Sequence, residues 1–333
     1  MKNVILMVGD GMGTSQIYAG LTANKGKLNL ERCTAIGFHK NQSADNYITD
    51  SAAGATAFAC GQKTYNGAIG VDVNKLPITT ILEIAEKNGL ATGLVATCAI
   101  THATPACFIS HQSARSLNED IALDFLKTDI DLFIGGGRKF FAQRADGKNL
   151  VDSLKMKNYQ IANSIEEVKK ITKGKLAAFL ADDQQTKFSE GRGDELVKST
   201  ETALQLLQQN KKGMFMMIEG SQIDWGGHSN DTQYIIDEMI DFDNAIGKVL
   251  DFARKDGNTL VIITADHETG GFALNGGDMK TGTVDGKFTT ENHTGVMIPV
   301  FAYGPRAEQF SGIYENTAIF DKMLSAFNFQ VKR

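Results

Sequence analysis

Short apolar runs rich in β-branched residues alternate with helical patterns along nearly the whole chain of 333 residues. Such runs are typical of parallel strands that are buried on both faces, and parallel strands need long crossover connections, usually helices. The candidate strands are Asn3–Val8, Ala91–Ala96, Leu132–Ile134, Met214–Ile218, Thr259–Thr264 and Ile298–Tyr303. We therefore predict an α/β three-layer sandwich, with a central, mostly parallel β-sheet flanked by helices.

Helical periodicity is clearest in the second half of the chain. Apolar residues repeat at helical spacing from about Thr232 to Ala253, and another helix begins after Asp194. The stretch at about 138–192 is more polar and less regular, so we expect a peripheral insertion there. We predict a single domain over residues 1–333, since large α/β sheets often reach this length as one unit.

The charge and hydropathy patterns exclude two classes of protein. The net charge is -5 and no basic block is present, so we expect no recognition of nucleic acid. No apolar stretch approaches the roughly 18 residues of a membrane span. The first apolar run, Val4–Val8, is too short for the core of a signal peptide, so we expect either a cytoplasmic protein or a sequence that starts after a removed leader.

The four cysteines show no CxxC spacing, so we do not expect zinc–thiolate chemistry. We favour buried, inert thiols, with one or two disulfides as the open alternative. The residues concerned are Cys33, Cys60, Cys98 and Cys107.

Three of the predicted strands are followed by an acidic residue. Asp10 follows the first strand, Glu219 follows the strand at 214–218, and Asp266 follows the strand at 259–264. Ligands bind at the carboxyl ends of the strands in open α/β sheets, so we expect these carboxylates to converge. Unpaired, they would repel one another, and divalent cations are the simplest way to stabilise such a cluster.

The glycines around Asp10 also invite a dinucleotide-binding interpretation. It fails because Thr14 stands where the third glycine of the fingerprint belongs, and because Asp10 would direct a negative charge at the pyrophosphate. We interpret Gly9–Gly13 as room for a metal close to Asp10, with a plain tight turn as the alternative.

Histidines supply a second group of candidate ligands. Asp224 and His228 are four residues apart, which places them on one side of a helical turn. His267 directly follows an acidic residue at a strand end, and His293 adds another imidazole, so this interpretation uses three of the six histidines. A satisfied polar loop is the alternative for the segment at 219–230.

Ligand hardness sorts these residues into three sites, because imidazole with carboxylate suits zinc and an all-oxygen set suits magnesium. The predicted sets are Asp224, His228 and His293 for one zinc, Asp10, Asp266 and His267 for a second zinc, and Glu219, the other oxygen of Asp10 and a hydroxyl for magnesium. The predicted cofactors are therefore two Zn²⁺ and one Mg²⁺ per chain. They would leave a positive pocket suited to a phosphate dianion.

A nucleophile and a phosphate ligand are also visible. Small residues follow Ser51, so we expect it at or near the N-terminus of a closely packed helix, where N–H groups favour an anion. A helix-capping serine is the alternative. Thr104 offers a hydroxyl for the oxygen-rich site. Arg115 offers a fork for two phosphate oxygens, although taken alone it also fits a surface arginine.

Taken together, these segments resemble the bacterial alkaline phosphatases over nearly the whole chain. The resemblance rests on Gly9–Gly11, Asp50–Ala52, His102–Pro105, Glu219–Ser221, Asp224–His228, Asp266–Glu268 and His293–Gly295, in that order. It implies a homodimeric phosphomonoesterase, periplasmic or secreted, with two zinc ions and one magnesium ion. It further implies Ser51 as the nucleophile, Arg115 as the phosphate clamp, and Thr104 as a magnesium ligand beside Asp10 and Glu219.

Two positions depart from the best-known enterobacterial pattern of that family. His102 and Trp225 stand where that pattern has an aspartate and a lysine near the magnesium and the phosphate, a combination similar to cold-adapted and thermophilic members. The resemblance also implies a crown-like segment at about 272–292 that is short compared with the crown of animal enzymes.

The resemblance implies hydrolysis of small phosphate monoesters by two in-line displacements through a phosphoserine, with release of inorganic phosphate and an alcohol. The nearest alternative is a phosphodiesterase or a phosphomutase of the same superfamily. A non-catalytic zinc-binding or phosphate-binding protein is the alternative from another class, but it would need neither a serine nor an arginine beside the metals.

Overall fold

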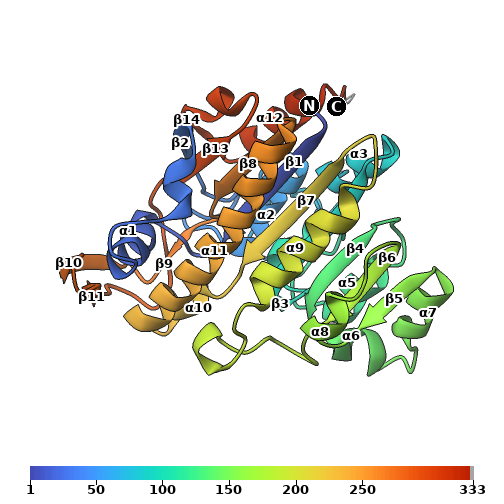
Figure 1. Ribbon diagram of the computed structural model, residues 1–333. Helices are drawn as coiled ribbons and strands as arrows, with labels where there is room; N and C mark the ends of the chain where they lie inside the picture. The colour runs from blue at the N-terminus through green and yellow to red at the C-terminus, as the bar shows by residue number, and fades with distance from the viewer. Residues whose placement is uncertain (331–333) are drawn as a thin grey trace.

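The structure of the protein is a computed structural model that describes residues 1–330. Ten strands form one large sheet through the middle of the molecule (Figure 1). In their order across the sheet, they are β14 (Gly312–Glu315), β2 (Ala35–Lys40), β13 (Ile298–Tyr303), β8 (Thr259–Thr264), β1 (Asn3–Gly9), β7 (Met214–Gly220), β3 (Ala91–Ala99), β4 (Leu132–Gly136), β6 (Lys175–Phe179) and β5 (Tyr159–Ala162).

Only β13 runs antiparallel to its neighbours in this sheet, β2 and β8; every other pair is parallel. The predicted fold class is confirmed, and all six predicted strands are present. The sequence analysis did not identify β2, β5, β6 and β14, which lie toward the two sides of the sheet. Part of the reason is visible in β2, where Gly37 and His39 occupy buried positions, so the strand has no continuous apolar run.

Helices cover both faces of the sheet (Figure 1). The sheet separates the hydrophobic core into two halves. Side chains of β1 alternate between the two halves: Val4, Leu6 and Val8 pack in one, and Ile5 and Met7 in the other. The first half includes residues of α2 (Ser51–Cys60), α3 (Ile81–Lys87), α5 (Asn118–Asp124) and α12 (Ala318–Phe327), and the second includes residues of α1 (Thr14–Ala23), α9 (Glu195–Leu207) and α11 (Thr232–Asp256). Both helices predicted in the second half of the chain, α9 and α11, are confirmed.

The register of the central strands aligns their carboxyl ends at one edge of the sheet. Val8 in β1 pairs with Glu219 in β7 and with Thr264 in β8, and Glu219 also pairs with Ala96 in β3. Asp10, which follows β1, therefore lies beside the ends of the neighbouring strands. This register is what places the predicted ligands at one edge of the sheet.

The less regular stretch at 138–192 supplies one side of the sheet, β6 and β5, together with the short helices α6 (Arg138–Ala142), α7 (Leu150–Met156) and α8 (Ile165–Val168). Its description as an insertion in a single domain stays a prediction. The segment at 272–292 contains a largely exposed hairpin, β10 (Ala273–Asp278) and β11 (Thr283–Lys287), which contacts α1. Within residues 1–330, no helix is long and apolar enough to cross a membrane.

Candidate active site

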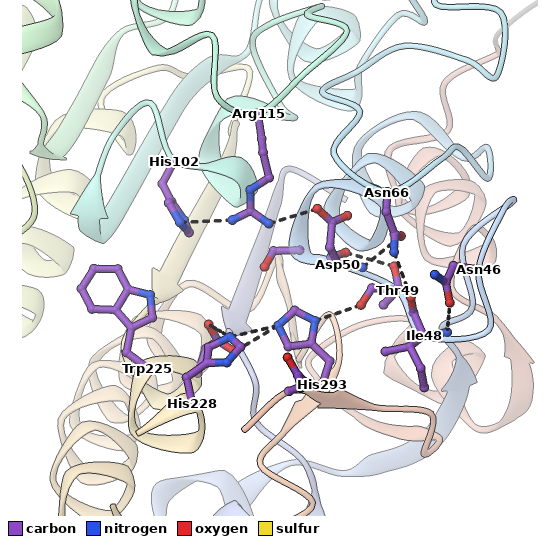
Figure 2. Close-up of a pocket in the computed structure, with 13 residues that line it drawn as sticks. Asn46, Ile48, Thr49, Asp50, Asn66, His102, Arg115, Trp225, His228 and His293 are labelled. Carbon is purple, nitrogen blue, oxygen red and sulfur yellow. Dashed lines mark hydrogen bonds and ion pairs between the residues drawn. The ribbon is translucent and has the colours of Figure 1, made fainter. Parts of the chain in front are cut away.

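A cavity of about 500 Å³ lies at the carboxyl end of the central strands, and Figure 2 shows the side chains that line it. Its lining includes Ser51, His102, Arg115, Trp225 and His228. These residues come from the start of α2, the start of α4 (Ala103–Ala106), the loop before α5, and α10 (Ile223–His228). The fold therefore brings residues from distant parts of the chain to one cavity.

The first predicted zinc set lies together at the cavity wall. His228 Nε2 is 3.3 Å and His293 Nε2 is 3.5 Å from the two carboxylate oxygens of Asp224, and the two Nε2 atoms are 3.2 Å apart. Both histidines direct Nδ1 at backbone carbonyls, His228 at Glu291 (2.6 Å) and His293 at Thr49 (2.9 Å). A carbonyl accepts only from an N–H, so Nδ1 of each ring carries a proton, and the two Nε2 atoms face one point beside Asp224, as histidine ligands do in metal sites.

The second predicted zinc set is buried completely. His267 Nε2 lies 3.1 Å from Asp266 Oδ2 and 3.5 Å from Asp10 Oδ1, and all three side chains have no solvent exposure. The backbone N–H groups of Gly11 and His267 donate to Asp266 Oδ1, which holds that carboxylate in place. These three residues provide one nitrogen and two carboxylates, a donor set that suits zinc.

The predicted magnesium ligands also lie in the buried part of the site. Glu219, Thr104 and Asp10 have no solvent exposure, and both carboxylate oxygens of Asp10 and Oε1 of Glu219 have no hydrogen-bond partner. Ser221 Oγ donates to the other Glu219 oxygen at 2.8 Å. Unpaired buried carboxylate oxygens are costly, so their presence fits a site built to hold cations.

The electrostatics of the site point to missing positive charge. Burial, followed by the charges of Asp266, Asp224 and Glu219, raises the pKa of Asp10 well above its usual value. Burial likewise raises the pKa of Glu219 to about 7. The hydrogen bond with Asp224 raises the pKa of His228 to about 9. A dication bound among these groups would lower the pKa values of the carboxylates and of the histidine.

Ser51 is the first residue of α2, and its hydroxyl lies 3.2 Å from His267 Nε2. The alternative that Ser51 caps the helix is wrong, because the cap is Asp50, whose Oδ1 accepts from the Ala53 N–H at 2.9 Å. The Ser51 hydroxyl is therefore left free for another role at the edge of the second zinc set. Its position at the helix N-terminus favours an anion beside it.

Arg115 lies between Asp50 and His102 at the cavity wall, as Figure 2 shows. Its Nη1 donates to Asp50 Oδ2 at 3.1 Å, and its Nη2 donates to His102 Nε2 at 3.2 Å. These contacts argue against a plain surface arginine, because the side chain is 31% exposed, lines the cavity and is held by two partners. The aromatic ring of Trp225 lies edge-on to His102, with the ring centroids 6.2 Å apart.

Gly11 has a positive φ of 74°, and a Cβ there would lie 2.6 Å from Asp224 Cα. The tight turn that the sequence analysis left as an alternative is therefore present. The missing side chain makes room for the Asp224 backbone and for Thr269, so that the turn after β1 and the start of α10 can approach closely.

Sequence reasoning missed two residues that support the site. Thr269 donates its hydroxyl hydrogen to Asp224 Oδ1 and contacts His267 Nδ1 at 3.2 Å, so it links the two zinc sets. Nothing in the local sequence indicates this role. Asp50 accepts hydrogen bonds from α2, from the Gly67 N–H and from Arg115. An acidic residue directly before a helix start is a capping signal that the sequence does carry.

The fold and the groups of metal-capable residues define the chain as a metal-binding hydrolase, and comparison with known proteins gives its family. The family model for alkaline phosphatase matches residues 1–287 and 281–329. The chain belongs to the alkaline phosphatase family. It is accordingly an enzyme, a phosphatase that hydrolyses phosphate monoesters.

Similar proteins match over almost the full chain. Alkaline phosphatase 4 of Bacillus subtilis (strain 168) is 34% identical over 401 residues, which cover 95% of this chain and 87% of that protein. The structure of the alkaline phosphatase from the Antarctic bacterium TAB5 is 45% identical, with a TM-score of 0.95 and 99% of both chains covered. A histidine-to-aspartate variant of the TAB5 enzyme has magnesium bound in its M3 site, at 44% identity, a TM-score of 0.93 and 99% coverage of both chains.

Buried carboxylates repel one another without cations. Zn²⁺ should therefore raise the melting temperature of protein from which a chelator has removed bound metal. An ion at 100 times its dissociation constant stabilises by about 2.7 kcal/mol per site. Differential scanning calorimetry measures the shift. We expect it to shrink in His228→Ala and to persist in the control His111→Ala, whose histidine pairs with Glu83 outside the site. Equal increases in melting temperature in the two variants would contradict the prediction that His228 binds zinc.

Proposed function

We propose that the protein is a metal-dependent phosphomonoesterase that works through a phosphoserine on Ser51. The observation that carries this proposal is the place of the Ser51 hydroxyl. It lies at the N-terminus of α2, 3.2 Å from His267, where the cavity meets the buried carboxylates. A purely metal-binding protein has no need of a free hydroxyl and a held arginine at that point.

The residues present fit the three predicted cations. Asp224, His228 and His293 would hold one zinc, and Asp10, Asp266 and His267 would hold a second. Glu219, Thr104 and another oxygen of Asp10 would hold magnesium, a proposal that the TAB5 variant with magnesium in its M3 site supports. Such cations supply Lewis acidity that stabilises negative charge on the attacking and leaving oxygens.

The residues of the chain then perform two displacements. In the first, Ser51 Oγ forms a bond to phosphorus as the bond to the leaving oxygen breaks, and the serine proton ends on the released alcohol. In the second, water attacks the phosphoserine, which releases inorganic phosphate and restores the Ser51 hydroxyl. The N-terminus of α2 stabilises the phosphoryl oxygens in both steps.

Arg115 binds and orients the phosphoryl group. Its guanidinium is held on one side by Asp50 and on the other by His102, so its remaining N–H groups are directed before the substrate arrives. Asp50 caps α2 with one carboxylate oxygen and holds Arg115 with the other. A single side chain thereby sets the position of the nucleophile relative to the phosphate clamp. Trp225 lines the cavity beside this group.

The proposal extends to assembly and location. We propose a homodimer, as the family resemblance implies; two exposed apolar side chains on the paired strands β2 and β14, Ile36 (55%) and Ile313 (65%), are available for such a contact. A periplasmic or secreted location follows from the family resemblance. Sedimentation equilibrium of the purified protein and fractionation of expressing cells test these two statements.

The Ser51→Ala substitution tests the nucleophile. We expect the rate of phosphate monoester hydrolysis to fall roughly 10⁴-fold or more, in the range seen when a catalytic nucleophile is removed, while bound zinc stays unchanged. Steady-state kinetics and metal analysis measure the two quantities. The control is Ser199→Ala, a buried serine in α9. Unchanged turnover in Ser51→Ala would refute the assignment.

The Arg115→Ala substitution tests the phosphate clamp. Charge-assisted hydrogen bonds contribute about 1.5–3 kcal/mol, so inhibition by inorganic phosphate should weaken roughly tenfold or more. Arg115→Lys should recover only part of the phosphate inhibition, because an ammonium group cannot form a bidentate contact with phosphate. Arg254→Ala, at the exposed C-terminal end of α11, serves as the matched control. Inhibition constants that stay equal in all variants would count against the clamp.

Substrate choice separates the proposal from its nearest alternative. An aryl phosphate monoester should be hydrolysed much faster than its methyl diester, and chelation should abolish the activity toward the monoester. Preference for the diester would favour a phosphodiesterase of the same superfamily, and transfer of phosphate within one substrate would favour a phosphomutase.

A further inference from the structure

Cys98 lies near the carboxyl end of β3, against the predicted magnesium site. Its side chain has no solvent exposure, and its thiol donates a hydrogen bond to Glu219 Oε2 at 3.4 Å, a bond that a shared ion would replace. Ligand atoms of Cys98, His102 and Glu219 all lie within 4.8 Å of one another. A buried thiol, a buried carboxylate and the half-buried imidazole of a cavity-lining residue thus lie close together.

The geometry points to a second, softer ligand set at the third cation site, in which Cys98, His102 and Glu219 bind Zn²⁺ in place of Mg²⁺. This inference rests on the third site of the proposed function and names the ion that competes for it. Thiolate and imidazole are ligands that zinc and cadmium prefer, whereas magnesium prefers oxygen.

The observed spacing fits such an ion. Zinc binds sulfur at about 2.3 Å and carboxylate oxygen at about 2.0–2.2 Å, so a tetrahedral ion separates neighbouring sulfur and oxygen ligands by about 3.5 Å. The Cys98 Sγ to Glu219 Oε2 distance of 3.4 Å is close to that value. The His102 ligand atom lies within 4.8 Å of the other two, so binding requires His102 to move toward them.

Two buried polar atoms of this set lack partners. His102 Nδ1 and Glu219 Oε1 have no hydrogen bond. Buried polar atoms normally have partners, because leaving one unpaired costs free energy. The oxygen-rich set already accounts for Glu219 Oε1, whereas it leaves His102 Nδ1 without a partner, so His102 Nδ1 is the atom that supports a further ligand at this group. On binding, the Cys98 thiol would release its proton to solvent and bind as thiolate.

Glu219 belongs to both ligand sets. The oxygen-rich set adds Asp10 and Thr104, and the softer set adds Cys98 and His102. We therefore expect Mg²⁺ and the softer ion to compete for one place. The sequence analysis did not expect zinc–thiolate chemistry because no CxxC motif is present. Cys98 and Glu219 are 121 residues apart, and only the pairing of β3 with β7 brings them together.

Occupation of the softer set has a consequence for Arg115. A neutral imidazole has one acceptor nitrogen, and His102 now uses it to accept from Arg115 Nη2 at 3.2 Å. An ion bound to Nε2 would take that lone pair. An ion bound to Nδ1 would leave the ring proton on Nε2, which could then no longer accept from Arg115. Arg115 would then keep only its contact with Asp50, so the choice of ion at the third site would change the affinity for phosphate.

The test uses the full chain with Cys33→Ser as the parent protein, because Cys33 is the half-buried thiol among residues 1–330. After chelation and addition of two zinc equivalents, the protein is titrated with Cd²⁺ or with Mg²⁺. The ultraviolet thiolate-to-cadmium charge-transfer band and the metal content report binding. The variants are Cys98→Ser and the matched control Cys60→Ser, another buried cysteine.

We expect the band in the parent and in Cys60→Ser, and its loss in Cys98→Ser. Cadmium affinity at the third site should fall by at least roughly tenfold, while Mg²⁺ uptake by Cys98→Ser should match the parent, which also shows that this variant is folded. If the protein takes up Mg²⁺ but the cadmium charge-transfer band persists in Cys98→Ser, the inference about Cys98 is wrong and the proposed third site stands. Uptake of neither Mg²⁺ nor Cd²⁺ would overturn the proposed third site and the inference together.

Discussion

Mutual repulsion among buried carboxylates is the constraint on which the rest of this structure depends. Asp10, Glu219, Asp224 and Asp266 lie together at the ends of parallel strands, with at most 4% of each residue exposed. Low-dielectric surroundings make that repulsion strong, and it raises the pKa of Asp10 well above its usual value, after burial itself. The two halves of the hydrophobic core hold the strands in the register that keeps these groups close. Such a cluster of buried carboxylates is suited to bind cations.

Hydrogen-bonding groups around the carboxylates orient the candidate ligands, the proposed nucleophile and Arg115. Backbone carbonyls orient His228 and His293, and the Thr269 hydroxyl joins the two zinc sets. Asp50 joins the start of α2 to Arg115, so the proposed nucleophile and phosphate clamp share one support. We infer that the catalytic cavity and the buried cation sites form one electrostatic unit, in which a change of ion affects the hydrogen bonds of the clamp.

Much of the fold and most of the candidate ligands could be predicted from the sequence. Strands buried on both faces, such as β1 and β7, are continuous apolar runs, and the acidic residues at their ends are visible by position. The strands β2, β5, β6 and β14 at the sides of the sheet were missed. The capping role of Asp50 carries a local signal, whereas the role of Thr269 depends on a contact with Asp224, 45 residues away.

The sequence by itself determined which residues can be buried, where the central strands of the sheet lie, and which donor atoms are available to cations, because these follow from composition and local periodicity. Only the tertiary structure decided which donors meet. The pairing of β9 (Glu268–Thr269) with β12 (His293–Thr294) returns His293 to the site, and the pairing of β3 with β7 sets Cys98 beside Glu219. Such distances depend on strand register and packing across the whole sheet, which no short stretch of sequence contains.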